Sequence, residues 1–385
     1  MESLPLGKQA GPDRIPNGIF KCMSHVFAKK YLAMLAEAIA NGELPRGMLQ
    51  GDISVMYKKK ERNDPRNYRP LTMLQNEYKI LTRILSKRLR EVVHEIIDEC
   101  QKGFVPNTFI ADATQLLQLI EQYTNDDLDR QGIMLFCDME KAFDRVSHEF
   151  LNDAVRAAGF GPNFCRMINM LYSEKDPARR RMYVNGYYGP WFDVRSGTAQ
   201  GCPLSPLLFL LVGQALKVFL DNETRIKGIS IGAERFKISQ YADDTTLLLR
   251  NVRELKLANK VLKKWEKATG MKENNTKREG LAMGKLRNMD LPQDMGIQWA
   301  KEGEWVISLG VPIGNEVDAE TFWRQKIKAT QAKSKRWLGM YRSTYFGRTL
   351  VVQAMYLGSL RYCWLYSLLM HKSTRWREYR PMSTG

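Results

Sequence analysis

Two groups of aspartates follow hydrophobic, strand-like segments, and they are the residues best suited to chemistry. Asp138 ends the apolar run 132–138, and Asp243 and Asp244 lie in the turn of a strand–turn–strand pattern over 236–249. Adjacent strands lie about 4.8 Å apart, so the ends of two such strands can bring carboxylates together. Carboxylates that converge without a cation repel one another and raise their pKa values, and a bound divalent cation removes that conflict.

The chemistry that such a cluster supports is phosphoryl transfer. Ligands that are all oxygen favour Mg²⁺ or Mn²⁺ over zinc. Two such ions, about 3.5–4 Å apart, stabilise the attacking and the leaving oxygen of the transferred phosphoryl group. Aspartate is also common in ordinary turns, so Asp243 and Asp244 taken alone fit a structural role equally well.

The segments around these aspartates form ordered motifs. Asp138 opens the sequence DMEKAFD, Gly197 opens the sequence GTAQGCPLSP, and Tyr241 opens the sequence YADD. In this order they resemble motifs A, B and C of reverse transcriptases. The closest likeness is to the enzymes of non-LTR retrotransposons, the long interspersed element type.

Four further segments agree with this resemblance, and they bring the number of ordered motifs to seven over nearly the whole chain. They are similar to the family's N-terminal element, fingers element, motif D and motif E, the primer grip. In that order they are Gly11-Pro12-Asp13 with Ile15-Pro16, Asn67 to Leu71 with Tyr78 to Leu81, Gly270 to Lys277, and Leu309-Gly310.

The resemblance implies a role for each acidic residue. Asp138 and Asp243 match the metal-binding carboxylates, together with the backbone carbonyl of Met139. Asp244 matches the second aspartate of motif C, which is catalytic and usually less directly engaged with metal. The implied cofactor is Mg²⁺, with Mn²⁺ as an alternative.

Other positions match residues that bind the nucleotide. Phe143 matches the aromatic steric gate, whose ring leaves no room for a 2′-OH; without the motif it would be read as a core residue. Gln200 matches the motif B glutamine beside the nucleotide and template, and Gly201 gives backbone clearance there. Lys141 and Ala142 precede the gate within motif A and are assigned to the same site.

Basic residues complete the implied nucleotide site. Lys58 and Arg69 match the fingers residues that clasp the triphosphate, although Lys59 and Lys60 adjoin Lys58. Lys277 matches the motif D lysine, a candidate acid for the leaving pyrophosphate. The alternative for Lys277 is a solvated surface lysine.

The chain also departs from the family pattern. Arg14 replaces the usual glycine of the N-terminal element, which is costly if that position needs a positive φ. Ala199 replaces a common arginine of motif B, and Arg278 lies where serine or threonine is frequent. None of these changes removes a metal ligand, but together they are compatible with a decayed element copy of reduced activity.

The resemblance implies an α+β right-hand polymerase with fingers, palm and thumb. We expect the fingers in 1–130, interleaved with the palm, the palm in 131–315 with motifs A to E, and a basic helical thumb in 316–385, either whole or truncated. The palm sheet would be antiparallel, similar to that of an RNA-recognition motif, and would carry the YADD hairpin. The order of strands and helices by itself favours a sheet covered on one face.

Local patterns predict the remaining elements. Residue periodicity predicts helices over 21–41, 76–98, 108–122, 147–158, 252–268 and, in the basic C-terminal part, 318–370. In 76–98 a basic stripe of Lys79, Arg83, Lys87 and Arg90 faces away from the apolar one. Strand patterns occur at 52–58, in a hairpin over 181–194 with its turn at Asn185-Gly186, and near 305–312.

Composition supports a polyanionic partner. The 385 residues carry 59 Lys and Arg against 42 Asp and Glu, a net charge of +17. Six scattered cysteines without a CxxC pair exclude a zinc finger and suit reduced thiols in the nucleus or cytoplasm. The N-terminus lacks a secretory signal, and the apolar stretch 202–220 contains two prolines and a lysine, so we expect a buried helix and no membrane segment.

These observations predict an RNA-directed DNA polymerase. Its partners would be an RNA template, a DNA primer, deoxynucleoside triphosphates and an endonuclease domain on the same or another chain. The chain looks like a fragment of a longer polyprotein or a shortened gene. The alternatives are an intron maturase-type reverse transcriptase and a catalytically decayed remnant that only binds RNA.

Overall fold

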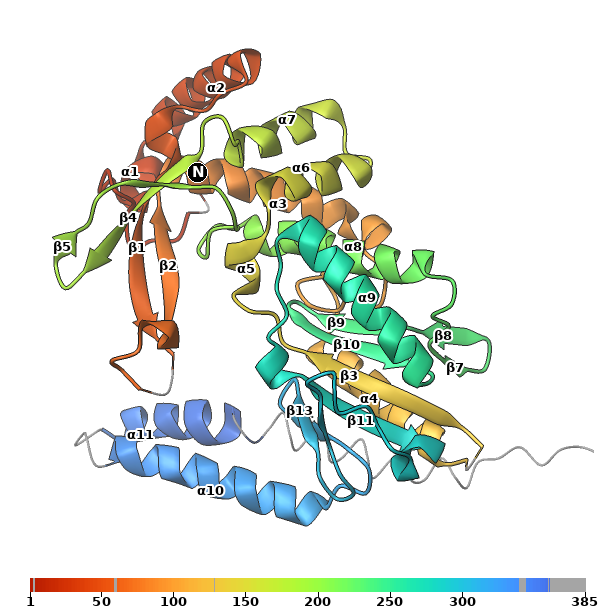
Figure 1. Ribbon diagram of the computed structural model, residues 1–385. Helices are drawn as coiled ribbons and strands as arrows, with labels where there is room; N and C mark the ends of the chain where they lie inside the picture. Colours follow the sequence, from red (N-terminus) through yellow and green to blue (C-terminus); the bar gives the residue numbers. More distant parts are fainter. Residues whose placement is uncertain (3, 59–60, 128, 339–343, 359, 361–385) are drawn as a thin grey trace, which may run out of the picture.

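Two five-stranded sheets form the framework of the chain in the computed structural model (Figure 1). The structure describes the chain except residues 3, 59–60, 128, 339–343, 359 and 361–385. The strand order is β2-β1-β4-β5 in the first sheet, with β6 beside β4, and β12-β11-β3-β10-β9 in the second. Two short hairpins, β7–β8 and β13–β14, complete the described strands.

The second sheet carries the predicted catalytic strands and is largely antiparallel. Its centre is β3 (Gln131–Cys137), which pairs antiparallel with β10 (Asp244–Leu249) on one side and β11 (Glu279–Gly284) on the other. β9 (Ile238–Tyr241) pairs antiparallel with β10 outside it, and β12 (Gln298–Trp299) adds a short parallel edge. The predicted α+β class and the hairpin over 236–249 are confirmed.

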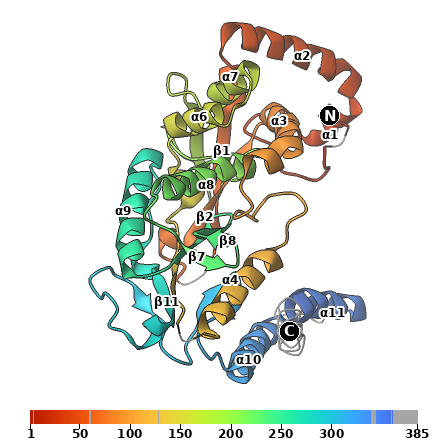
Figure 2. The same cartoon turned by 90° about the vertical axis from the view of Figure 1, so that its right-hand side faces the viewer.

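Both faces of this sheet are covered, so the prediction of a sheet covered on one face is wrong. Side chains of Ile133 and Leu135 pack with α8 (Ser205–Asn222) and α9 (Val252–Thr269). On the other face, Met134 and Phe136 pack with α4 (Ile110–Asn125) and the β13–β14 hairpin. Figure 2 shows α9 and α4 on opposite sides of the strands. The physical reason is the continuous apolar run of β3, which leaves neither face fit for water.

The first sheet joins distant parts of the chain. β1 (Gln50–Tyr57) pairs antiparallel with β2 (Tyr68–Leu74) and parallel with β4 (Ala178–Val184). β5 (Tyr187–Tyr188) and β6 (Phe192–Val194) both fold back onto β4, as the predicted hairpin requires. Residues 178–194 therefore lie with the N-terminal strands, although they follow the motif A segment in sequence.

The helices confirm most of the predicted ranges. α3 (Asn76–Ile96) buries Leu81, Leu85 and Leu89, while Lys87 and Arg90 of its basic stripe are exposed. The other helices in the first 171 residues are α1 (Asn17–Cys22), α2 (Ser24–Asn41), α5 (Ala142–Arg145), α6 (His148–Ala157) and α7 (Pro162–Leu171). No helix in the described part of the chain is both long and apolar enough to cross a bilayer.

The segment near 305–312 differs from the prediction of a single strand. It is a hairpin of β13 (Val306–Ser308) and β14 (Val311–Ile313), because Leu309 and Gly310 both adopt positive φ, 51° and 86°. The basic C-terminal part is helical over α10 (Ala319–Leu338), α11 (Tyr345–Val351) and a short π-helix, Val352–Leu357. Residues 339–343, 359 and 361–370 of the predicted helical range lie outside the described residues.

Candidate active site

The predicted carboxylates meet at one end of the second sheet. Asp138 directly follows β3, and Asp243 and Asp244 lie where β9 turns into β10. Thr245 of β10 pairs with Cys137 of β3, so Asp244 and Asp138 are the next residues on two adjacent strands. The register of the strands thereby brings motifs A and C side by side.

A buried glutamine holds the turn between β9 and β10. The side chain of Gln101 accepts hydrogen bonds from the N–H of Ala242 at 2.9 Å and of Gly103 at 2.8 Å, and its amide donates to the Ala242 carbonyl at 3.3 Å. Ala242 has a φ of 57°. A Cβ on Gly103 would lie 2.1 Å from the backbone nitrogen of Ala242, so only glycine fits against this turn. Gln101 and Gly103 were not predicted from the sequence, because no local spacing connects them with Ala242, which lies 141 positions after Gln101.

The carboxylates affect one another electrostatically. The pKa of Asp244 is raised to about 6, mainly by its partial burial and secondly by repulsion from Asp243 and Asp138. The positive charge of Lys58 opposes this shift. A cation between the carboxylates would relieve this repulsion, so the donor set fits a hard divalent metal. Within the described residues, no three Asp, Glu, His or Cys side chains are gathered closely enough to hold a metal by themselves.

Motif D lies against motif A. The Nζ of Lys277 donates to Oδ2 of Asp138 at 2.6 Å, and the Asn274 amide reaches the same oxygen at 3.4 Å. The backbone N–H of Asn274 donates to the Asp138 carbonyl at 2.8 Å. Because the side chains of Lys277 and Asp138 are 56% and 42% exposed, water screens their ion pair and leaves both groups accessible. Asn274, like Gln101 and Gly103, was not predicted from the sequence to belong to the site.

A buried ion pair lies next to Lys277. Arg278 Nε and Glu273 Oε1 are 3.0 Å apart, and each side chain is only 4% exposed. The guanidinium of Arg278 also donates to Oδ1 of Asn259 at 3.1 Å, which ties the loop to α9. Burial raises the pKa of Glu273. Arg278, which departs from the family pattern, therefore has a structural role here.

The predicted steric gate lies on the short helix α5. The ring of Phe143 packs on Phe209 of α8 at a centroid distance of 4.6 Å and meets the edge of Phe104 at 6.3 Å. Lys141 precedes the helix with a φ of 49°, and Ala142 is buried. Phe143 is half-buried, so part of its ring remains open to a ligand.

The motif B loop lies against the first sheet. The side-chain amide of Gln200 donates to Oδ1 of Asp144 at 3.3 Å. The backbone carbonyl of Gln200 accepts a hydrogen bond from the Thr72 N–H at 2.9 Å. Gly201 has a φ of 118°, and a Cβ there would lie 2.6 Å from the Thr72 oxygen. Glycine is thus required at this contact between the loop and β2.

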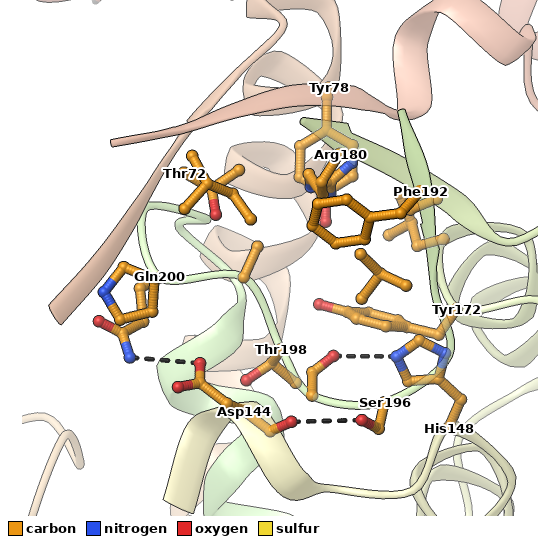
Figure 3. A pocket seen from close by; sticks show the side chains of 17 residues that line it. Thr72, Tyr78, Asp144, His148, Tyr172, Arg180, Phe192, Ser196, Thr198 and Gln200 are labelled. Atoms are coloured by element: carbon orange, nitrogen blue, oxygen red, sulfur yellow. Dashed lines mark hydrogen bonds between the residues drawn. The ribbon is translucent and has the colours of Figure 1, made fainter. Parts of the chain in front are cut away.

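A cavity of about 210 Å³ lies behind the motif B loop, as Figure 3 shows. Asp144 and Gln200 line one side and His148 and Tyr172 the opposite side, while Arg180 lies beside Tyr78 at the top of the view. Nε2 of His148 lies 2.9 Å from the Gly197 carbonyl, and burial lowers the pKa of this histidine. The neutral His148 ring donates from Nε2 to this carbonyl, and this hydrogen bond holds the motif B loop in place from the cavity side.

The fingers residues lie at the tip of the β1–β2 hairpin. Lys58 directly follows β1, and its N–H donates to the Asn67 carbonyl at 2.8 Å. Arg69 lies on β2 with an exposed side chain, opposite Met56. Lys58 contributes to the electrostatics of Asp244, whereas the role of Arg69 in binding triphosphate stays a prediction.

Arg14 adopts the strained conformation that the sequence comparison suggested. Its φ is 62°, and its N–H donates to the Gly11 carbonyl at 2.9 Å in a tight turn. A non-glycine residue in this region carries a conformational cost. The cost lies in the N-terminal element and does not affect the carboxylates.

Comparison with known proteins agrees with this geometry. The family described as "Reverse transcriptase (RNA-dependent DNA polymerase)" matches residues 57–341. The chain is 29% identical to a transposon TX1 149 kDa protein of Xenopus laevis, over 81% of this chain and 24% of that protein. It is also 29% identical to a Pol polyprotein from retrotransposable element R2 of Nasonia vitripennis, over 62% and 22%. The chain thus spans about a quarter of the length of these relatives.

A solved structure is also similar. Apo telomerase from Candida tropicalis has a TM-score of 0.42 and 14% identity, over 72% of this chain and 58% of that one. The family match covers most of the chain, and these relatives are transposon proteins, so the resemblance to the reverse transcriptases of non-LTR retrotransposons is confirmed. This chain belongs to the reverse transcriptase family.

Proposed function

We propose that this chain is the polymerase domain of a non-LTR retrotransposon protein and extends a DNA primer on an RNA template. The observation that carries the proposal is the meeting of Asp138, Asp243 and Asp244 at the ends of adjacent strands. In the reaction, the primer 3′-oxygen bonds to the α-phosphorus of a deoxynucleoside triphosphate. The bond to the bridging oxygen breaks, and pyrophosphate leaves.

Mg²⁺, or Mn²⁺, is the cofactor that the oxygen donors suit. Asp138 and Asp243 would hold it, together with the carbonyl of Met139, and Asp244 would act from beside them. When bound, the metal supplies charge neutralisation for the attacking and leaving oxygens. The raised pKa of Asp244 supports this assignment, because burial and repulsion from Asp243 and Asp138 disfavour its charged form, which a bound cation would favour.

The remaining residues of the site would position and neutralise the triphosphate. Lys58 and Arg69 on the β1–β2 hairpin would contact its phosphates, and Lys277 would give a proton to the leaving pyrophosphate. Gln200, fixed by Asp144 and β2, would lie beside the nucleotide and template. Phe143, with Lys141 and Ala142 before it, would press on the sugar.

The wider organisation is part of the same proposal. We assign the fingers to 1–130, the palm to 131–315 and the thumb to 316–385. The pairing of β4 with β1 supports the interleaving of fingers and palm. An endonuclease domain, on the same or another chain, and a nuclear or cytoplasmic location complete the proposal.

Primer extension by the purified chain tests this function. The substrate is a DNA primer annealed to an RNA template, with deoxynucleoside triphosphates and Mg²⁺. We expect extension that stops when a chelator removes the metal and resumes when Mg²⁺ is restored. A folded chain that binds the hybrid but does not extend it with either Mg²⁺ or Mn²⁺ would instead be an RNA-binding remnant.

A further inference from the structure

A second, basic pocket lies at the end of the catalytic sheet away from Asp138. It has a volume of about 540 Å³ and is lined by the start of β3, by β7 (Ile229–Ile231) and β8 (Glu234–Phe236), and by residues that follow β10 and β11. β3 spans its seven residues between this pocket and Asp138, which at about 3.3 Å per residue separates the two by roughly 20 Å. Figure 1 shows the β7–β8 hairpin far from α10 and α11.

Positive charge dominates the lining of this pocket. Five cationic side chains line it against one carboxylate, that of Asp129; they are Arg130, Lys227, Arg235, Arg250 and Lys285. Lys285 lies 2.8 Å from Asp129, but the carboxylate is 90% exposed, so a stronger anion can displace it. Outside the lining, Asp127 lies 3.4 Å from Arg130 and offsets part of that charge.

Three of the cations are available to a ligand. The side chains of Lys227, Arg235 and Arg250 are exposed and have no hydrogen bond or ion pair with any side chain that the structure describes. They come from three separate segments of the chain. Like charges that converge in this way are stabilised by an anion that bridges them.

The backbone under two of these cations is held rigidly. Glu254, at 4% exposure, accepts hydrogen bonds from the N–H groups of Lys227 at 2.9 Å, Gly228 at 3.1 Å and Arg250 at 2.9 Å. The Glu254 carboxylate therefore fixes the main chain and does not neutralise the side chains of Lys227 and Arg250. The pocket is therefore formed before a ligand arrives, which lowers the entropic cost of binding.

We propose that this pocket binds backbone phosphates of an RNA strand outside the catalytic cleft, without reading its bases. Arg130 lies 3.6 Å from the centroid of the Tyr123 ring and covers it, so this ring is not free to stack on a base. Sequence-specific RNA recognition depends on such stacking, whereas phosphate contacts need only placed cations. An acidic peptide finds little apolar anchorage, because the aliphatic side chain of Ile229 is buried.

Salt-dependent binding of a single-stranded RNA tests the proposal. The test variant replaces Lys227, Arg235 and Arg250 with Gln. The control variant carries Lys256→Gln, Lys260→Gln and Lys263→Gln, an equal charge change at exposed positions of α9. Each phosphate contact on a single strand contributes about 0.7 to the slope of log affinity against log salt, so the test variant should lower the slope by about 2. The control should keep the wild-type slope.

Two outcomes would overturn the proposal. The first is a folded test variant with the wild-type slope, or an equal loss of slope in the control. The second is a poly-glutamate peptide that binds the wild type and not the test variant while the RNA slope stays unchanged, which would assign the pocket to an acidic protein. If the triple variant unfolds, Arg235→Gln alone, at an exposed hairpin position, should lower the slope by about 0.7. Because binding is measured without nucleotides, failure of polymerase activity would not affect the result.

Discussion

Phe143 is the residue whose role is least decided by its position. Its ring packs on Phe209, as a core residue would, yet it remains half-buried on the short helix α5. A gate and a core residue differ in what they do to selectivity. A gate affects ribonucleotides and deoxynucleotides differently, whereas a core residue affects both through the stability of α5.

Phe143→Val separates these two roles. Removing the ring opens space for a 2′-OH, so we expect ribonucleotide incorporation to rise relative to deoxynucleotide incorporation by about 10²-fold. The measurement is kcat/KM for a matched ribo and deoxy pair in the wild type and the variant. An unchanged ratio in a folded variant would identify a core residue and weaken the motif A alignment.

Lys277 is the cation closest to Asp138 and is exposed enough to reach a leaving group. Lys277→Met should lower the rate of nucleotide addition by about 10²-fold, the usual loss when a general acid is removed, with little change in nucleotide KM. Lys272→Met in the same loop is the matched control, because Lys272 is exposed and contributes only its backbone carbonyl to motif A. Equal effects of the two variants would refute the specific role of Lys277.

The loop 272–278 is positioned by its buried ion pair as well as by its backbone. Arg278→Met leaves the charge of Glu273 buried without its ion-pair partner, and we expect a loss of about 3–5 kcal/mol in the free energy of unfolding. Glu273→Gln combined with Arg278→Met removes both charges and should restore most of the loss. Urea denaturation of the single and double variants measures this, and additive losses would show that the two charges do not interact.

Helix α4 carries a carboxyl group that links stability to pH. Burial raises the pKa of Glu121 to about 7, although Oε1 accepts a hydrogen bond from Asn125 at 2.6 Å. A carboxyl group whose pKa is raised by folding stabilises the folded state fully at pH values below its unfolded-state pKa, about 4.3. This stabilisation is lost as the pH rises through the folded-state pKa of about 7. Glu121→Gln should therefore be more stable than the wild type at pH 8, by roughly 3 kcal/mol, and similar at pH 4. Denaturation curves whose difference does not change with pH would contradict this.

At the scale of the whole molecule, the pairing of β3 with β10 in the second sheet was predictable because its signals are local. Asp138 ends an apolar strand and Asp243 lies in a hairpin turn. Only the register between β3 and β10 was needed to bring these two residues together. Gln101 was not predictable, since its partner Ala242 is distant in sequence and its type is common in loops. The hairpin at Leu309 was missed because two positive φ values interrupt a continuous apolar run.

The coverage of the sheet also depended on long-range packing. Helix α4 precedes β3 in the chain, and no local pattern indicates which face it covers. The pairing of β4 with β1 likewise joins residues more than 120 positions apart. Periodicity predicts an element and its buried side, whereas its neighbours are decided by contacts that the local sequence does not contain.

The most direct test of the account measures single-nucleotide extension and hybrid binding together, in the wild type, Asp138→Asn and Asp243→Asn. Each substitution removes a proposed metal ligand with little change of volume. We predict that both variants lose extension and keep the affinity for the RNA–DNA hybrid, because most binding energy lies in phosphate contacts. Extension by either variant at close to the wild-type rate would contradict the assignment of these carboxylates as the catalytic metal ligands.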